Sequence, residues 1–190
     1  MPIEFAVATP VALPAQSGIT HAYATMHLAD AFAIGLPPGA SRDPEVLARF
    51  IVAHQPSWIG TLTHIRDLIV ARFGLKTARQ LATLAGDTRA RRIGIFKIYS
   101  AGDTEIVLGE DDKHLDFRVS LLCFGAATPE SGAELTVSTV VHCHNALGRA
   151  YIAVIAPFHR RVILASLRRA AAIGWPHATV HHGAAGEVRQ

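Results

Sequence analysis

The chain has 190 residues, of which 50% are hydrophobic and 17% are charged, and its mean hydropathy is +0.27. This composition excludes a chain that is disordered throughout, and a chain of this length can bury a core of its own as one domain. The net charge is +3, but the basic residues are scattered apart from pairs such as Arg91-Arg92. Because nucleic-acid-binding surfaces concentrate positive charge on one face, no nucleic-acid partner is indicated.

The first 20 residues are apolar and contain prolines, and the first lysine or arginine of the chain is Arg42. A secretory signal begins with basic residues, and no apolar run approaches the roughly 20 residues of a membrane-spanning helix. We therefore expect a cytoplasmic protein that does not insert into a membrane, with residues 1–20 as a lead-in. Cys123 and Cys143 fall in apolar runs, which favours two buried thiols over a disulfide.

The first half of the chain predicts one strand and two helices. Alternating apolar side chains over residues 21–34 predict a strand that ends at the Gly- and Pro-rich residues 35–39. Asp43, followed by Pro44, predicts the start of a helix that reaches about residue 54. A second helix is expected from Ser57, and Gly74 would end it. Residues 76–92 read as a loop with a short helical turn.

The second half predicts four strands and a long helix. The strand runs are residues 93–99, 104–108, 114–124 and 134–144, and their short connections indicate an antiparallel meander. Asn145 is a helix cap, and the helix after it should reach about Ala172, a length of ~40 Å, with a kink at Pro157. Its main apolar stripe is formed by Leu147, Tyr151, Val154, Phe158, Val162 and Ala165.

This order of elements predicts an α+β fold in which a curved antiparallel sheet wraps around the long C-terminal helix. Two short helices follow the first strand. The expected domain covers residues 21–173, between the lead-in and a tail over residues 174–190.

Three motifs carry a resemblance to a known family. They are GEDDKHLDFR at residues 109–118, HNALGRAY at 144–151 and PFHRR at 157–161. With these motifs the chain resembles an uncharacterised bacterial family, domain of unknown function 2867, over roughly residues 21–172. That family resembles the helix-grip superfamily of START-like lipid carriers, pollen-allergen-like binders and polyketide cyclases. The resemblance implies a cavity between sheet and helix for an apolar small molecule, and it implies no catalytic residues.

The last two predicted strands form a hairpin that brings ionisable side chains together. Its loop sets Ser120 near Ser138, which places Arg118 near Val140 and Asp116 near His142, with opposed Cβ atoms about 5 Å apart. Imidazole and carboxylate groups suit zinc or iron. The alternative is a solvated sheet face with ion pairs, and we favour this alternative. We therefore expect no metal and no other cofactor. The candidate metal ligands are His114, His142 and His144.

Asp116 and Arg118 alternate with Phe117 and Val119, so the charged and apolar rows face opposite sides of the strand. If the charged row faced an enclosed interior, Asp116, Arg118 and His142 would be candidate catalytic residues with shifted pKa values. If it faces outward, the pair contributes less than about 1 kcal/mol. We favour the outward orientation, because the apolar row is better suited to line the interior.

The function that we expect is the binding or transport of a hydrophobic small molecule or lipid, without catalysis. An alternative is a cyclase- or dehydratase-like enzyme that uses Asp116, Arg118 and a nearby histidine. A second alternative is a protein-interaction module, and a homodimer is one way to cover the apolar flanks of the long helix. The residues from which we expect ligand contacts are Trp58, Phe96, Phe117, Val119, Tyr151 and Phe158.

Overall fold

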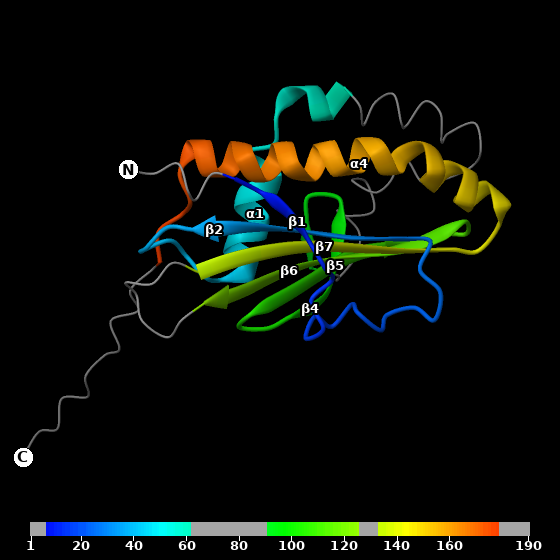
Figure 1. Ribbon diagram of the computed structural model, residues 1–190, viewed down its shortest axis with the longest axis horizontal. Coiled ribbons are helices and arrows are strands. Elements are labelled where there is room, and N and C mark those ends of the chain that lie inside the picture. Colours follow the sequence, from blue (N-terminus) through cyan, green and yellow to red (C-terminus); the bar gives the residue numbers. More distant parts are fainter. Residues whose placement is uncertain (1–6, 62–90, 126–132, 179–190) are drawn as a thin grey trace, which may run out of the picture.

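The computed structural model describes residues 7–61, 91–125 and 133–178. The strands are β1 Thr9–Val11, β2 Leu28–Leu36, β3 Arg92–Ile93, β4 Phe96–Ala101, β5 Glu105–Asp111, β6 Leu115–Gly125 and β7 Ala133–Cys143, and the helices are α1 Pro44–Ala53 and α4 Ala146–Ile173. The strands form one antiparallel sheet in the order β1-β2-β7-β6-β5-β4-β3. Both helices pack on the same side of this sheet (Figure 1). The predicted α+β fold is confirmed.

The pairing of β6 with β7 follows the predicted register. Ser120 lies opposite Ser138, and Arg118 lies opposite Val140. Asp116 lies opposite His142. The turn between β5 and β6 is shorter than expected, because β5 continues to Asp111, which pairs with Asp116. Glu110 and Asp111 are therefore strand residues, and the predicted end of this strand at residue 108 is wrong.

The two sides of the sheet are covered by different parts of the chain. On the helix-facing side, Phe32, Leu121 and Val137 belong to the main core with residues of α1 and α4. On the outer side, residues 12–27, the N-terminal strap, cover the sheet, and Ile19 packs with Val107 and Val140. The N-terminal part of the chain is thus an integral cover of the second face.

The strap is tied to the sheet by Glu105. Its carboxylate accepts hydrogen bonds from the Ser17 hydroxyl (2.6 Å) and from the backbone N–H of Gly18 (3.0 Å). The Ser120 hydroxyl of β6 donates to the same carboxylate (2.5 Å). The predicted strand start at residue 21 is wrong, because the alternation over residues 21–27 belongs to the strap and β2 begins at Leu28.

The single strand predicted for residues 93–99 is divided in two. β3 and β4 form a hairpin in which Ile93 pairs with Phe96. Gly94 stands at the first position of the two-residue turn with φ of +58°. Glycine adopts such a conformation without steric cost, which explains how the chain reverses inside an apolar run.

Both predicted helix starts in the first half are confirmed. Asp43 caps α1, and its carboxylate accepts hydrogen bonds from the N–H groups of Glu45 (2.8 Å) and Val46 (3.2 Å). A second helix begins at Ser57, and its described part ends at residue 61. The rest of that helix, its predicted end at Gly74 and nearly all of the loop expected after it lie outside the described residues.

The start of α4 is held close to the sheet. Asn145 caps the helix as predicted, because its side chain accepts a hydrogen bond from the Gly148 N–H (3.0 Å). A Cβ atom on Gly148 would lie 2.3 Å from the carbonyl oxygen of His114, so only glycine permits this approach. Pro157 lies within the helix, and Figure 1 shows the first part of α4 turned away from the line of the rest, as expected of a proline kink.

The face of α4 that packs on the sheet differs from the predicted stripe. Val154 and Phe158 were expected to be covered, but 62% and 44% of their surfaces are exposed. The prediction for these two residues is wrong because the sheet-facing row is only partly apolar and so carries a weak sequence signal. Its buried residues are Gly148, Ile152, Ser166, Leu167 and Ala170.

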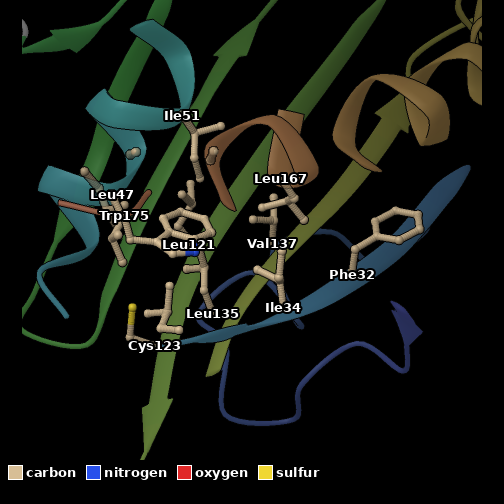
Figure 2. Packing of buried hydrophobic residues seen from close by; sticks show 14 of the residues in the cluster. Phe32, Ile34, Leu47, Ile51, Leu121, Cys123, Leu135, Val137, Leu167 and Trp175 are labelled. Carbon is tan, nitrogen blue, oxygen red and sulfur yellow. The ribbon is translucent and has the colours of Figure 1, made fainter. Parts of the chain in front are cut away.

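The main core lies under the second half of α4. Figure 2 shows Leu167 of α4 and Ile51 of α1 above Val137 and Leu121 of the sheet. Leu167 is 1% exposed, and the neighbouring core residues are similarly shielded. This half of the interface between helix and sheet is therefore closed.

The segment directly after α4 returns to the core. Trp175 is buried, and its ring centroid lies 6.2 Å from that of Phe50. The backbone N–H of Ser41 donates to the carbonyl of Pro176 (2.6 Å). The prediction of a frayed tail from residue 174 is wrong for residues 174–178, and the later residues lie outside the described part.

The two cysteines are free and buried, as predicted. Cys143 lies opposite Leu115, whereas Cys123 lies opposite Leu135 at the other end of the same strand pair. Burial raises the pKa of the Cys123 thiol to about 12 and also raises that of Cys143. Such thiols are poor nucleophiles near neutral pH.

By length and composition alone, one helix in the described part of the chain, α4, could cross a membrane. The sequence expectation rested on uninterrupted apolar runs, and arginines interrupt the apolar residues of α4. A single helix of this kind is weak evidence, because long helices of soluble proteins meet the same criterion.

Candidate functional site

Three half-buried apolar side chains lie on the helix-facing side of the sheet, and a fourth lies on the first half of α4. Phe96 and Val119 pack against the main core, and Phe117 and Tyr151 pack against a smaller cluster around Ile152. The rings of Phe96 and Phe117 meet edge to face, with centroids 6.0 Å apart. We call these four residues the apolar surface. All were expected from the sequence to contact a ligand, and the structure brings them to the helix-facing side.

The other two expected ligand residues lie elsewhere. Trp58, in the helix that begins at Ser57, is 42% exposed, and Phe158 is exposed on α4. Neither residue belongs to the clusters that contain the apolar surface. The structure therefore does not bring these two side chains together with the other four.

A buried polar group adjoins the apolar surface. Asp30 of β2 lies opposite Thr139 of β7, which in turn lies opposite Val119 of β6. His159 of α4 reaches down to this row. Its Nε2 atom lies 3.1 Å from the Thr139 hydroxyl and 3.4 Å from Asp30 Oδ1. Neither carboxylate oxygen of Asp30 has a hydrogen-bond partner, and both are shielded from solvent.

Sequence reasoning missed this group, although a signal was present. Along β2, Asp30 occupies the same parity as Leu28, Phe32 and Ile34, which face the helices. A carboxylate in an otherwise apolar row is costly to bury without partners. Asp30 could therefore have been named as a candidate functional residue from the sequence, without knowledge of its contact with His159 of α4.

The geometry does not support a Thr-His-Asp catalytic triad. In such a triad the nucleophile and the carboxylate contact different nitrogens of the imidazole. Here both Thr139 and Asp30 approach Nε2 of His159. The ring therefore cannot pass a proton between them in the manner of a triad, and the group is better suited to binding.

The outer side of the sheet carries the residues proposed for catalysis, in the orientation that we favoured. Arg118 donates from one Nη to Asp111 Oδ1 (2.7 Å), and its guanidinium carbon lies 3.6 Å from the ring centroid of Tyr99. The Tyr99 hydroxyl donates to the other Asp111 oxygen (2.8 Å). Tyr23 of the strap lies on the same guanidinium at 5.7 Å. We call these four residues the Arg118 cluster.

Gly109 makes room for this cluster. It lies directly opposite Arg118 in the ladder of β5 and β6. A Cβ atom at Gly109 would lie 2.3 Å from the Phe117 carbonyl oxygen and 3.0 Å from Cδ of Arg118. The arginine thus crosses β5 over a glycine to reach Asp111. This contact gives the GEDDKHLDFR motif a structural role.

The Arg118 cluster shifts the ionisation of its members. Burial alone would raise the pKa of Asp111, but hydrogen bonds from Arg118 and Tyr99 and the charge of Arg118 hold it below its usual range. Burial raises the pKa of Tyr23 to about 12, against the opposing effect of the Arg118 charge. The Tyr23 hydroxyl is shielded and has no hydrogen-bond partner.

The three candidate metal ligands have separate partners. His142 Nδ1 lies 2.7 Å from the Thr25 carbonyl oxygen, and His144 Nε2 lies 3.1 Å from Asp116 Oδ1. The Asn145 amide lies 2.9 Å from Nδ1 of His114. Within residues 7–61, 91–125 and 133–178, no group of three or more His, Cys, Asp or Glu side chains could hold a metal ion. The structure gives the metal hypothesis no support.

The chain matches the family model described as protein of unknown function (DUF2867) over residues 22–166. It belongs to this family. No curated protein and no solved structure matches the chain. In this DUF2867 protein the apolar surface, Asp30 and the Arg118 cluster all fall within the matched range. The family description names no activity, so function must be inferred from geometry.

One hollow of the DUF2867 protein, about 430 Å³ in volume, lies elsewhere. It is formed by the start of α1 and the turn between β4 and β5, and its lining includes Arg42, Asp43, Glu45 and Asp103. Hydrogen bonds from Arg49 and Arg91 to Glu45 lower the pKa of that carboxyl. Its charged lining makes this hollow a poor match for an apolar ligand.

Proposed function

We propose that the protein binds or transports a hydrophobic small molecule or lipid at the apolar surface, without catalysis. The observation that carries the proposal is the contrast along α4. At its second half the helix-facing side of the sheet is closed by Leu167, whereas Tyr151 of its first half and Phe96, Phe117 and Val119 of the sheet remain half-buried. Contact with an apolar ligand would stabilise such side chains by roughly 25 cal/mol per Å² removed from water.

The arrangement of the elements supports the same proposal. A long helix packed on a curved sheet is consistent with a helix-grip-like arrangement, in which a ligand lies between the two layers. Pro157 interrupts the hydrogen bonds of α4 next to the apolar surface. The first half of the helix can therefore adjust its position with less loss than an unbroken helix.

The test is the binding of N-phenyl-1-naphthylamine, a neutral apolar fluorescent probe, to the protein and to two variants. Val119→Trp adds bulk to the apolar surface, whereas Val154→Trp adds the same bulk at an exposed site of α4. We expect Val119→Trp to weaken probe binding at least tenfold and Val154→Trp to leave it unchanged. Absence of saturable binding, or equal binding by both folded variants, would contradict the proposal.

A second candidate function is acid-base catalysis of the cyclase or dehydratase type on the outer side of the sheet. The observation that favours it is the Tyr23 hydroxyl, which is shielded without a partner and lies beside Arg118 and His142. Less supports this candidate, because Asp116, Arg118 and His142 each contact another group and the strap covers this side.

The two candidates differ in the histidines that a ligand would perturb. Nitrogen chemical shifts of the imidazoles can be followed during titration with the probe. Binding at the apolar surface should move the signals of His159 and leave those of His142 unchanged. The opposite pattern would favour the outer side.

The expected cytoplasmic location remains a prediction.

A further inference from the structure

Asp30 is a buried carboxylate beside the apolar surface, and the apolar side chains there cannot donate a hydrogen bond to it. Its side chain is 11% exposed, and both carboxylate oxygens lack a hydrogen-bond partner. The only cation-forming group at contact distance in the described part of the chain is the His159 imidazole, at 3.4 Å from Oδ1. Leaving a charged group buried and unpaired costs more than the 1–3 kcal/mol typical of a neutral polar group.

His159 cannot satisfy the carboxylate by itself. Its Nε2 atom is shared with the Thr139 hydroxyl, which is closer at 3.1 Å. A single N–H group can serve one Asp30 oxygen at most, and Oδ2 then remains without a donor. The Asp30 carboxylate can therefore accept a hydrogen bond from a donor group of a bound ligand.

The position of Asp30 relates this acceptor to the apolar surface. Val119, Thr139 and Asp30 form a row across β6, β7 and β2. Neighbouring strands are about 4.8 Å apart, so Asp30 is roughly 10 Å from Val119 along this row. A ligand whose apolar part lies on Val119 and Phe117 can place its head group at Asp30. The His159 side chain, which contacts Asp30, is 19% exposed.

We propose that Asp30 selects apolar ligands that carry an N–H donor head group, primary alkylamines above all. This inference rests on the proposed function and names the ligand class of the same site. A primary ammonium group offers three donors and a positive charge to a carboxylate that can only accept. A hydroxyl offers one donor without charge. A fatty-acid carboxylate offers no donor and is repelled by Asp30.

The test uses four decyl compounds to displace bound N-phenyl-1-naphthylamine from the unmodified protein. Decylamine should displace the probe at a concentration at least tenfold lower than decanoate, with decanol between them. Decyltrimethylammonium carries the charge but no N–H group, and we expect it to bind at least threefold more weakly than decylamine. Equal displacement by decylamine and decanoate would overturn the inference, as would equal displacement by the two cations.

Two variants locate the effect. Asp30→Asn keeps the shape but supplies its own donors, and it should bring decylamine and decanoate within threefold of each other. Glu134→Gln, which alters an exposed carboxylate on the same sheet, should keep the tenfold preference. A preference that survives in Asp30→Asn would overturn the inference. Failure of the probe itself to bind would instead overturn the proposed function, so the two failures are distinguishable.

Discussion

At the scale of single residues, the clearest dependence is that of Arg118 on Gly109. The arginine reaches Asp111 and Tyr99 because its partner in the ladder has no side chain. A methyl group there would meet the Phe117 carbonyl at 2.3 Å, which the backbone can accommodate only by shifting. Contacts between β5 and β6 therefore explain the Gly109, Asp111 and Arg118 positions of the GEDDKHLDFR motif.

We expect Gly109→Ala to lower the free energy of unfolding by about 1–3 kcal/mol, the range for overpacking at a closed site. Gly102→Ala is the matched control, because its Cβ would meet only the Glu105 carbonyl at an ordinary 3.6 Å. Urea denaturation measures both. Equal urea midpoints for the two variants would contradict this, because they would show that the strands accommodate a methyl group at Gly109 without loss of stability.

Tyr23 gives a prediction in alkaline solution. Its pKa is raised to about 12, whereas an unfolded tyrosine titrates near 10. Since the folded state retains the proton longer, its stability should fall as pH rises from about 10 to about 12. Burial also raises the pKa of Tyr99, so ultraviolet titration of tyrosinate should show late absorbance that Tyr23→Phe reduces. A variant with the same late absorbance as the unmodified protein would assign that absorbance to another tyrosine.

At the scale of elements, the N-terminal strap depends on one carboxylate. Glu105 accepts hydrogen bonds from Ser17, Gly18 and Ser120, and so joins the strap to β5 and β6. The strap has little regular structure of its own, and these hydrogen bonds hold it together with the packing of Ile19 and the contacts of Tyr23 and Thr25 with the sheet. Loss of the carboxylate should release the strap before the sheet unfolds.

We expect Glu105→Ala to reduce hydrogen-exchange protection of the Gly18 amide and to destabilise the strap by about 1.5–3 kcal/mol, the range for bonds to a charged acceptor. Glu134→Ala removes an exposed carboxylate from β7 and should leave that protection unchanged. If Gly18 exchanged at the same rate in both variants, Glu105 would not be the anchor.

The elements also show where sequence reasoning succeeds. Asp43, Asn145 and the β6–β7 register are local signals, and each appears in the structure as expected. The strap and the sheet-facing row of α4 were mistaken, because each depends on contacts between distant segments. Gly148 faces the sheet with no apolar side chain to signal that it does so.

At the scale of the whole molecule, the layer order could be predicted but the site only in part. The parity of Phe117 and Val119 correctly indicated the side of the sheet that faces the helix. Asp30 and His159 are 129 positions apart in the chain, and only the docking of α4 on β2 brings them together. No local sequence pattern predicts this contact, although a charged residue in the apolar row of β2 indicated that Asp30 needs a partner.

The oligomeric state remains a prediction. Val154 and Phe158 are exposed on α4, and a second copy of the chain could cover them. If a homodimer forms, light scattering at micromolar concentration should give twice the 20.3 kDa mass of one chain. Phe158→Glu should then return the mass to that of a monomer, because burying a carboxylate in the contact is costly. A monomer mass for the unmodified protein would contradict the homodimer.

The burial of Trp175 has a practical consequence. The chain contains two tryptophans, and the other one, Trp58, is exposed to water over 42% of its surface. Their emission spectra should differ, with the shielded indole at shorter wavelength and out of reach of iodide. Replacing Trp58 by phenylalanine would leave a single tryptophan, at the junction of α4, α1 and the returning C-terminal segment. Detachment of that segment could then be followed optically, with no label attached to the protein.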